Sequence, residues 1–414
     1  MEPITLFKDK RILLGVTGSI AAYKAVDLAS KLTQVGALVD VIMTDAAQRF
    51  VLPITFSSVT GRPVYTSMWH SDTGGGLPTH IAHVGLGEGA DLFVIAPITA
   101  NTIAKLASGL ADDLLSVTAL AAHCPTIIAP AMDGGMYQHP ATQSNLHTLV
   151  KRGVTLIEPE VGRFASGMVG KGRFPDTLTL IGHIRRVLGR EGALAGRKIV
   201  ITAGGTREAI DPVRYITNHS SGKQGYALAQ AALDVGADVI LISAARNLPV
   251  PLGAALVPVN SAQQMCDVVL KYVDGADALI KAAAVADFRP AQIADQKIKK
   301  SHDASEAPSL ALTRTPDILL AVKQQRAESG WPRVVVGFAA ESQNLLDNAQ
   351  DKLTRKGLDM IVANDITAPD AGFAVDTNRV VILDAQGAQE SLDLASKAAV
   401  SEQVIARVVT LLES

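Results

Sequence analysis

The feature that most constrains the fold of this chain is an apolar strand that runs into a glycine-rich turn and then into a helix. Residues 199–201 read Ile-Val-Ile, the pattern of a buried parallel strand. The turn at 203–206 reads Ala-Gly-Gly-Thr, where small residues allow a close backbone approach. Residues 218–225 read Asn-His-Ser-Ser-Gly-Lys-Gln-Gly and lead into a helix start. This combination suits a phosphate-bearing ligand, and a loop that only caps a helix is the alternative.

The N-terminal part of the chain shows the same plan. An apolar strand at residues 11–16 is followed by a glycine turn, a helix with apolar residues at 3–4 spacing, and a strand at 39–44. Further apolar strands at 90–97 and 126–132 end in small or polar residues. Ligands bind at the carboxyl ends of strands in such sheets. We therefore expect an α/β protein with two Rossmann-like domains, each built on a parallel sheet.

The plan of strand, glycine turn and helix thus occurs twice in the chain, and this repeat sets the expected domain boundaries. We place the first domain at residues 1–189, a polar, glycine-containing linker at 190–196, and the second domain at 197–414. In the second domain, the strand at 379–383 is expected to close the sheet. Residues 161–174 are rich in glycine and cations and predict a flexible flap. The charged segment 290–308, which carries Lys297, is typical of a solvated loop.

Composition excludes several classes of protein. The 414 residues are 48% hydrophobic and 19% charged, as in a globular protein. The formal net charge of −2 argues against a nucleic-acid partner. The two cysteines, Cys124 and Cys266, do not make a disulfide framework. Because we also see no signal peptide and no membrane span, we expect a cytoplasmic protein.

The glycine turn of the first domain leaves its ligand open. Gly15, Gly18 and Ser19 suit a dinucleotide, a flavin phosphate or plain packing. Thr44 stands where an NAD enzyme is expected to carry an acidic residue, so NAD is disfavoured and we expect flavin mononucleotide (FMN). His70, His80 and His83 match no standard zinc spacing, so the sequence assigns no metal ligands.

Longer motifs in both domains carry a family resemblance. The second domain contains TAGGTREAIDPVRYITNHSSGKQG, which resembles the nucleotide-binding core of phosphopantothenate–cysteine ligases. The first domain contains, in order, GVTGSIAAYK, HIAHVGL, APITANTIAKLASGLADDLLS and PAMDGGM. These resemble the flavodoxin-like, homo-oligomeric flavin-containing cysteine decarboxylases. The chain from residue 8 to 412 thus resembles the family of bifunctional phosphopantothenoylcysteine decarboxylase/phosphopantothenate–cysteine ligases.

The resemblance implies two consecutive steps of coenzyme A biosynthesis. In the first, CTP with Mg²⁺ activates 4'-phosphopantothenate as an acyl-cytidylate, and the amine of cysteine displaces CMP. In the second, FMN-dependent oxidation of the cysteine side chain to a thioaldehyde lets CO2 leave, and 4'-phosphopantetheine results. The family also implies a homo-oligomer, with trimers of the first domain and dimers of the second, an arrangement that a dodecamer satisfies. The alternatives are a non-catalytic flavin-binding regulatory subunit, or a flavin-dependent prenyltransferase for the N-terminal half.

The resemblance also assigns residues of the first domain. His80 is the implied base or proton shuttle of the decarboxylase. The implied FMN-binding residues are Gly15, Gly18, Ser19, Ile20, Thr44, Thr99, Ala100, Asn101 and Met132. The implied contacts to the decarboxylase substrate are Asp133, Met136 and Lys171.

In the second domain, Asn218 is implied to hold the acyl intermediate and Lys297 to reach the triphosphate. The implied CTP- and substrate-binding residues are Gly204, Gly205, Ser220, Ser221, Gly222, Lys223, Asp287, Lys297, Phe338, Lys352 and Lys356.

The sequence departs from the family pattern at three positions. Thr99 stands where relatives usually have serine, and it keeps the hydroxyl group. Asp133 replaces an asparagine, and its carboxylate would repel a substrate carboxylate unless it is protonated or turned away. Ser166 stands in the flap where relatives often carry a cysteine, so we expect its hydroxyl to relay a proton or to hold the substrate rather than to act as the acid.

Overall fold

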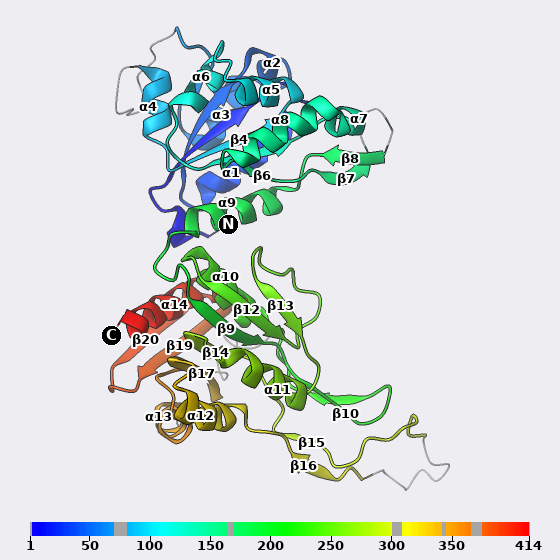
Figure 1. The fold of residues 1–414 in the computed structure, drawn as a ribbon. Helices are drawn as coiled ribbons and strands as arrows, with labels where there is room; N and C mark the ends of the chain where they lie inside the picture. The colour runs from blue at the N-terminus through cyan, green and yellow to red at the C-terminus, as the bar shows by residue number, and fades with distance from the viewer. Residues whose placement is uncertain are drawn as a thin grey trace. The chain divides into compact units, whose positions relative to one another are not determined.

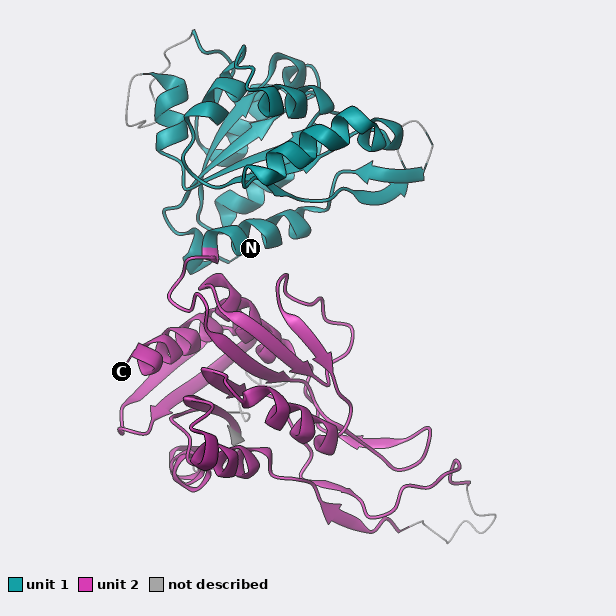
Figure 2. Ribbon diagram, in the orientation of Figure 1, with its two compact units in different colours: residues 1–188 teal, residues 189–414 magenta. Residues whose placement is uncertain are grey.

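The computed structural model describes residues 2–69, 81–163, 167, 169–299, 309–341, 345–365 and 375–413. The chain divides into two compact units, residues 1–188 and 189–414, and each has its own sheet and its own core (Figures 1 and 2).

The first unit is built on a parallel sheet. Its strands lie in the order β3 (Val64–Tyr65), β2 (Leu38–Met43), β1 (Arg11–Val16), β4 (Leu92–Ile98), β5 (Thr126–Pro130) and β6 (Thr155–Leu156). All neighbouring strands pair in parallel. Successive residues of β1 face opposite sides of the sheet: Ile12 and Leu14 belong to one core, and Leu13 to the other. Burial on both faces explains why these strands read as continuous apolar runs.

Helices cover both faces of this sheet (Figure 1). One core receives apolar side chains from α1 (Ala22–Gln34), α3 (Pro53–Thr60) and α9 (Thr177–Gly189). The opposite core receives them from α4 (Ala82–Glu88), α5 (Ala100–Ser108), α6 (Leu114–Ala121) and α8 (Pro140–Lys151). The unit also contains a 3-10 helix at Thr5–Phe7, α2 (Asp45–Gln48) and α7 (Gly134–Gln138).

The segment expected to be a flexible flap contains a β-hairpin. Strands β7 (Glu160–Arg163) and β8 (Val169–Arg173) pair antiparallel. The backbone N–H of Met132 donates a hydrogen bond to the carbonyl oxygen of Gly172 at 3.1 Å, which ties this hairpin to the end of β5.

The second unit has a larger, mixed sheet. Its strands lie in the order β13 (Ala255–Pro258), β12 (Asp238–Ser243), β9 (Lys198–Ala203), β14 (Ala278–Lys281), β17 (Val334–Glu341), β18 (Met360–Asp365), β19 (Thr377–Asp384) and β20 (Gln389–Ser396). One face is covered by α10 (Lys223–Asp234) and α14 (Lys397–Glu413). The other is covered by α11 (Ala262–Val273), α12 (Ile318–Ser329) and α13 (Leu345–Lys356).

Two short hairpins extend from this sheet (Figure 1). Strands β10 (Arg207–Ala209) and β11 (Tyr215–Thr217) form one of them. Strands β15 (Phe288–Pro290) and β16 (Leu312–Arg314) form the other. We call the two together the arm.

Two sequence-based expectations need correction in this unit. The sheet is not wholly parallel, because β19 pairs antiparallel with β18 and with β20. The strand at 379–383 does not close the sheet either, since β20 lies beyond it. Strand β20 has no buried residue, so it lacks the apolar run that marks the central strands.

The segment 190–196, expected to be a linker, packs against the second unit. Leu194 is 1% exposed and belongs to the core beneath α10. Its backbone N–H donates to the carbonyl oxygen of Val235 at 2.8 Å. The structural division therefore falls at residue 188, earlier than the expected start of the second domain.

The side chains of Ser261 and Gln264 form a capping box at the start of α11. Among the described residues, no helix is long and apolar enough to cross a membrane.

Candidate active sites

In the first unit, the sequence-predicted FMN residues lie at one edge of the sheet, where β1, β2, β4 and β5 end side by side. Hydrogen bonds join their loops. Thr17 Oγ1 donates to the carbonyl oxygen of Pro97 at 2.8 Å and accepts from the backbone N–H of Thr99 at 3.0 Å. Ser19 Oγ donates to the carbonyl oxygen of Ala131 at 3.2 Å. The fold thus brings together the turn after β1, the start of α5 and the end of β5.

Gly18 has a packing reason of its own. A Cβ atom at this position would lie 2.4 Å from Cβ of Ala46, closer than real atoms approach. Any larger residue would therefore push the turn away from α2. This glycine alone does not distinguish a phosphate site from tight packing.

A cavity of about 460 Å³ opens beside this turn. Among the sequence-predicted residues, Ser19, Ile20, Met132 and Asp133 line it. The lining also includes three cations for which the sequence predicted no ligand-binding role: Lys24, Arg163 and Arg173. Apolar side chains together with cations and hydroxyl groups fit a ligand that carries an aromatic ring and a phosphate. These lining residues lie far apart in the sequence, so the spacing of motifs could not group them.

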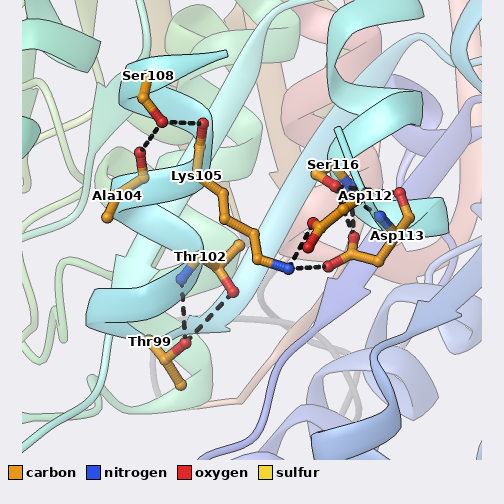
Figure 3. Close-up of polar contacts among 8 residues, drawn as sticks. All are labelled: Thr99, Thr102, Ala104, Lys105, Ser108, Asp112, Asp113 and Ser116. Carbon is orange, nitrogen blue, oxygen red and sulfur yellow. Dashed lines mark hydrogen bonds and ion pairs between the residues drawn. The ribbon is translucent and has the colours of Figure 1, made fainter. Parts of the chain in front are cut away.

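Thr99, a sequence-predicted residue, forms hydrogen bonds at the start of α5 (Figure 3). Thr99 is the N-cap of α5, and its Oγ1 accepts from the backbone N–H of Thr102 at 3.4 Å. Further along α5, Lys105 Nζ lies 2.6 Å from the carboxylate of Asp112 and 2.8 Å from that of Asp113. Asp113 in turn caps α6. The ion pairs of Lys105 therefore connect the second half of α5 to the start of α6.

Asp133 acts as a helix cap. It is the N-cap of α7, and its Oδ1 accepts from the backbone N–H of Gly135 at 3.0 Å. Because one carboxylate oxygen faces the helix N-terminus, part of its charge is stabilised there. This arrangement lessens the repulsion expected between Asp133 and a substrate carboxylate. Met136, on the same short helix, is 53% exposed and does not line the cavity.

Lys171 is held by an acidic partner. Its Nζ lies 2.7 Å from Oε2 of Glu158, which also accepts from the hydroxyl of Tyr137 at 2.6 Å. Burial alone would raise the pKa of Glu158, but the hydrogen bonds from Lys171 and Tyr137 outweigh it and lower that pKa. Burial and the nearby carboxylate raise the pKa of Tyr137. His80 and Ser166, the two expected catalytic residues of this half, lie outside the described residues.

In the second unit, the glycine turn packs against two other loops. Gly204 has φ +84°, and a Cβ there would lie 2.3 Å from the backbone nitrogen of Ala245. Gly205 forms an isolated parallel bridge with Ala284. Asn218 Nδ2 donates to the carbonyl oxygens of Ala284 at 3.3 Å and Val285 at 3.2 Å. The turn after β9, the loop before α10 and the segment after β14 thus meet.

A cavity of about 500 Å³ lies at this junction, and we call it the loop cavity. The sequence-predicted residues that line it are Asn218, Ser220, Ser221, Gly222, Lys223, Asp287, Phe338 and Lys352. The lining also includes a second group that the sequence did not predict, because its members come from four different elements: Gln224, Asn364, Asn378 and Lys397.

Hydrogen bonds connect three side chains of this second group, Gln224, Asn364 and Asn378. Gln224 Nε2 donates to Ser401 Oγ at 2.8 Å, which leaves its oxygen to accept from Asn378 Nδ2 at 2.7 Å. Asn364 Nδ2 donates to Asn378 Oδ1 at 3.3 Å. Oδ1 of Asn364 is buried and has no hydrogen-bond partner among the described residues. Burial, together with Lys223, lowers the pKa of Lys397.

A second cavity of about 590 Å³, the helix cavity, lies beside α12 and α13. Asp287, Lys352 and Lys356 line it among the sequence-predicted residues. Lys356 is buried and forms an ion pair with Asp317, the N-cap of α12. Burial would raise the pKa of Asp317, but the hydrogen bond from Lys356 outweighs it and the pKa is lowered. Lys281, Val285, Asp287 and Lys352 line both cavities, which therefore adjoin.

Lys297 is not brought to either cavity. It is exposed and lies on the arm. The backbone beside it is held by a hydrogen bond from the N–H of Ile298 to Oδ2 of Asp211 at 3.2 Å. Within the described parts of the chain, no group of three or more histidine, cysteine or acidic side chains is arranged to hold a metal ion.

Comparison with known proteins places both units in families. Residues 194–412 match the model of the "DNA/pantothenate metabolism flavoprotein C-terminal domain", and residues 4–189 match the "Flavoprotein" model. Over 409 residues the chain is 45% identical to coenzyme A biosynthesis bifunctional protein CoaBC of Bacillus subtilis (strain 168), covering 98% of both chains. The chain belongs to the family of bifunctional coenzyme A biosynthesis proteins. The expected family and the two-unit α/β fold are confirmed.

Each of the two units is similar to a solved structure. One is the C-terminal domain of a coenzyme A biosynthesis bifunctional protein, 38% identical, with a TM-score of 0.45, covering 54% of this chain and 98% of that one. Another is a PPC decarboxylase variant complexed with pantothenoylaminoethenethiol, 32% identical, with a TM-score of 0.39, covering 43% of this chain and 97% of that one.

Membership in this family settles the general activity. The bifunctional protein is an enzyme of coenzyme A biosynthesis with decarboxylase and ligase activities. The N-terminal unit belongs to the flavoprotein family, so the expected flavin is confirmed at that level. The regulatory-subunit and prenyltransferase alternatives are not favoured.

Proposed function

We propose that the second unit joins 4'-phosphopantothenate to cysteine with CTP as the activating nucleotide. A carboxylate oxygen of the acid attacks the α-phosphorus, and pyrophosphate leaves. The cysteine amine then attacks the acyl carbon, and CMP leaves. The observation that carries this proposal is the pair of adjoining cavities, because an acyl-cytidylate needs one space for its acyl part and another for its nucleotide.

We assign the acyl part to the loop cavity and the nucleotide to the helix cavity. Asn218 would hold the acyl end, while Ser220, Ser221 and Lys223 offer donors to an anion at the start of α10. Lys352 and Lys356 would meet the phosphates. Mg²⁺ would arrive bound to the triphosphate, as is usual for nucleotide substrates. Lys297 would join them only if the arm moves toward the helix cavity.

We propose further that the first unit binds FMN and decarboxylates 4'-phosphopantothenoylcysteine. When bound, FMN supplies a two-electron acceptor for the cysteine side chain. Ser19 and the cations Lys24, Arg163 and Arg173 would hold its phosphate. Thr99, Ala100, Asn101 and Thr44 would complete the site from the neighbouring strand ends, and His80 would accept the proton.

Exposed apolar side chains support the proposed homo-oligomer. In the first unit, Ile20 and Tyr23 are 61% and 62% exposed. On the arm of the second unit, Val213 and Leu312 are 61% and 51% exposed. Contacts between copies of the chain would bury these apolar side chains, in trimers of the first unit and dimers of the second. We place the assembly in the cytoplasm, because its two cysteines are free and make no disulfide framework.

One experiment tests both activities. The purified protein is inspected for a flavin absorption spectrum and then supplied with 4'-phosphopantothenate, cysteine, CTP and Mg²⁺. We expect release of pyrophosphate and of CO2, with CO2 release dependent on CTP because ligation makes the decarboxylase substrate. A colourless protein, or pyrophosphate release that is equally fast without the acid substrate, would contradict the proposal.

A further inference from the structure

Lys281 is a charged residue at the end of an otherwise apolar central strand. It is the last residue of β14, paired in register with Thr202 of β9 and Gly337 of β17. The rest of β14 reads Ala-Leu-Ile and is buried. Because side chains alternate along a strand, Lys281 shares the face of Leu279, whose core also contains α12 and α13.

The amine of Lys281 has no hydrogen bond or ion pair among the described residues. The charged groups facing it are Asp287 on the loop after β14, Asp317 at the start of α12, and Lys352 and Lys356 on α13. Asp317 is already engaged by Lys356. Burial, with repulsion by Lys352, lowers the pKa of Lys281 to about 8. A partly buried amine that no carboxylate neutralises is suited to an anionic ligand.

The position of Lys281 says which part of a ligand it would meet. It lines both the loop cavity and the helix cavity. A molecule that spans the two cavities must therefore pass beside it. In an acyl-nucleotide the group between the acyl part and the nucleoside is the phosphoryl group.

We propose that the ammonium form of Lys281 contacts the phosphoryl group through which the acid substrate is activated, and stabilises its negative charge in both half-reactions. This inference rests on the proposed ligation with CTP. In the first half-reaction a carboxylate oxygen bonds to phosphorus while the bond to pyrophosphate breaks. In the second the cysteine nitrogen bonds to the acyl carbon while the bond to CMP breaks, and the amine proton passes to solvent. Lys281 gives and takes no proton; it supplies a charge where charge accumulates.

This role has a pH signature. Only the charged form of Lys281 supports fast ligation. We therefore expect kcat/KM to fall as pH rises through about 8, where the free enzyme loses that charge. Bound anions favour the charged form, so kcat should fall only at higher pH. Lys281→Arg keeps its charge and should remove this fall in kcat/KM. Lys281→Met should lower both half-reactions by about 10- to 100-fold below pH 8. Its deficit in kcat/KM should shrink above that pH, where the free wild-type enzyme also lacks the charge.

The test compares wild type, Lys281→Arg, Lys281→Met and the control Lys271→Met. Lys271 is an exposed lysine of α11 that lines neither cavity. Pyrophosphate release with CTP and the acid substrate reports the first half-reaction, and CMP release after cysteine is added reports the second. Decarboxylase activity of the same chains, assayed on 4'-phosphopantothenoylcysteine, measures the amount of intact protein.

We expect Lys271→Met to behave as wild type. The inference is overturned if the wild type is active and Lys281→Met matches it, or if Lys281→Arg declines with pH as the wild type does. A wild-type rate that rises through this pH range and is lost in Lys281→Arg would instead identify a proton acceptor and also overturn the inference. If the wild type releases no pyrophosphate from CTP, the proposed function fails first, and this inference fails with it.

Discussion

Oε2 of Glu158 lies 2.7 Å from the ammonium group of Lys171 and 2.6 Å from the hydroxyl oxygen of Tyr137. Lys171 belongs to β8 and Tyr137 to α7, so this one oxygen connects the hairpin to the helix that follows the Pro-Ala-Met motif. The sequence predicts a substrate contact for Lys171. Its ion pair gives it a second role, which is to set where the hairpin lies relative to α7.

The first prediction concerns Glu158→Gln. The amide can still accept from Tyr137 but no longer pairs with the charge of Lys171, so the hairpin should lie less accurately against α7. We expect kcat/KM for decarboxylation to fall about 10-fold, because small misplacements near a reacting group are costly. Ligase activity of the same protein should not change. Glu88→Gln, at an exposed position of α4, is the control. An equal loss of both activities would point to general unfolding instead.

The second prediction concerns Asp113 and pH. Its Oδ1 accepts from the backbone N–H of Ser116 at 2.8 Å, and its Oδ2 from Lys105 at 2.8 Å (Figure 3). Burial would raise the pKa of Asp113, but the hydrogen bonds from Lys105 and Ser116 outweigh it and lower that pKa. A lowered pKa in the folded state means that the carboxylate stabilises the fold above its unfolded pKa of about 3.9. This stability is lost as pH falls through the lower, folded pKa.

We therefore expect Asp113→Ala to cost about 1 kcal/mol of unfolding free energy at neutral pH, and less in acid. Calorimetry of the first unit's transition at several pH values measures this. Asp112→Ala is the matched control, since Asp112 pairs with the same lysine but is more exposed and caps no helix. A loss for Asp113→Ala that does not shrink toward acid pH would contradict the electrostatic part of the explanation.

The third prediction concerns where the second unit begins. Leu194 is buried, so a fragment that starts at residue 197 leaves part of its core open. We expect the fragment 189–414 to be more stable than 197–414, and Leu194→Ala to cost about 2–4 kcal/mol in the longer one. Chemical denaturation measures both, with Leu252→Ala, at an exposed position, as the control. Equal stability of the two fragments would show that 190–196 is a linker after all.

The pattern of apolar strands and glycine turns predicts most of the fold, because the central parallel strands of both sheets, such as β1, β4, β9 and β14, are buried on two faces. It misses β20, whose exposed, alternating residues resemble a loop, and the packing role of Leu194 within a polar segment. In the sites, spacing and family motifs find residues on the loops after strands. They do not find Glu158, Asn364 or Lys281, whose roles depend on contacts with residues far away in the sequence.

The fourth prediction concerns His80, which lies outside the described residues. Imidazole can accept a proton near neutral pH, whereas an amide cannot. His80→Asn should therefore keep its flavin spectrum and its ligase activity while CO2 release stops. The measurement is CO2 release from 4'-phosphopantothenoylcysteine at equal flavin absorbance. Decarboxylation at the wild-type rate would remove His80 from the mechanism.

The last prediction separates the two ligase half-reactions. Asn218 Nδ2 donates to the carbonyl oxygens of Ala284 and Val285, so in Asn218→Asp a carboxylate oxygen would face two other acceptors. We expect the loop to shift at the acyl end and the acyl-cytidylate to accumulate. Lys297→Gln should instead slow formation of the acyl-cytidylate, since it removes a charge that the arm would bring to the triphosphate. Quenched assays with cysteine first omitted and then added identify the step that fails. If both variants fail at the same step, Asn218 and Lys297 do not divide the reaction as proposed.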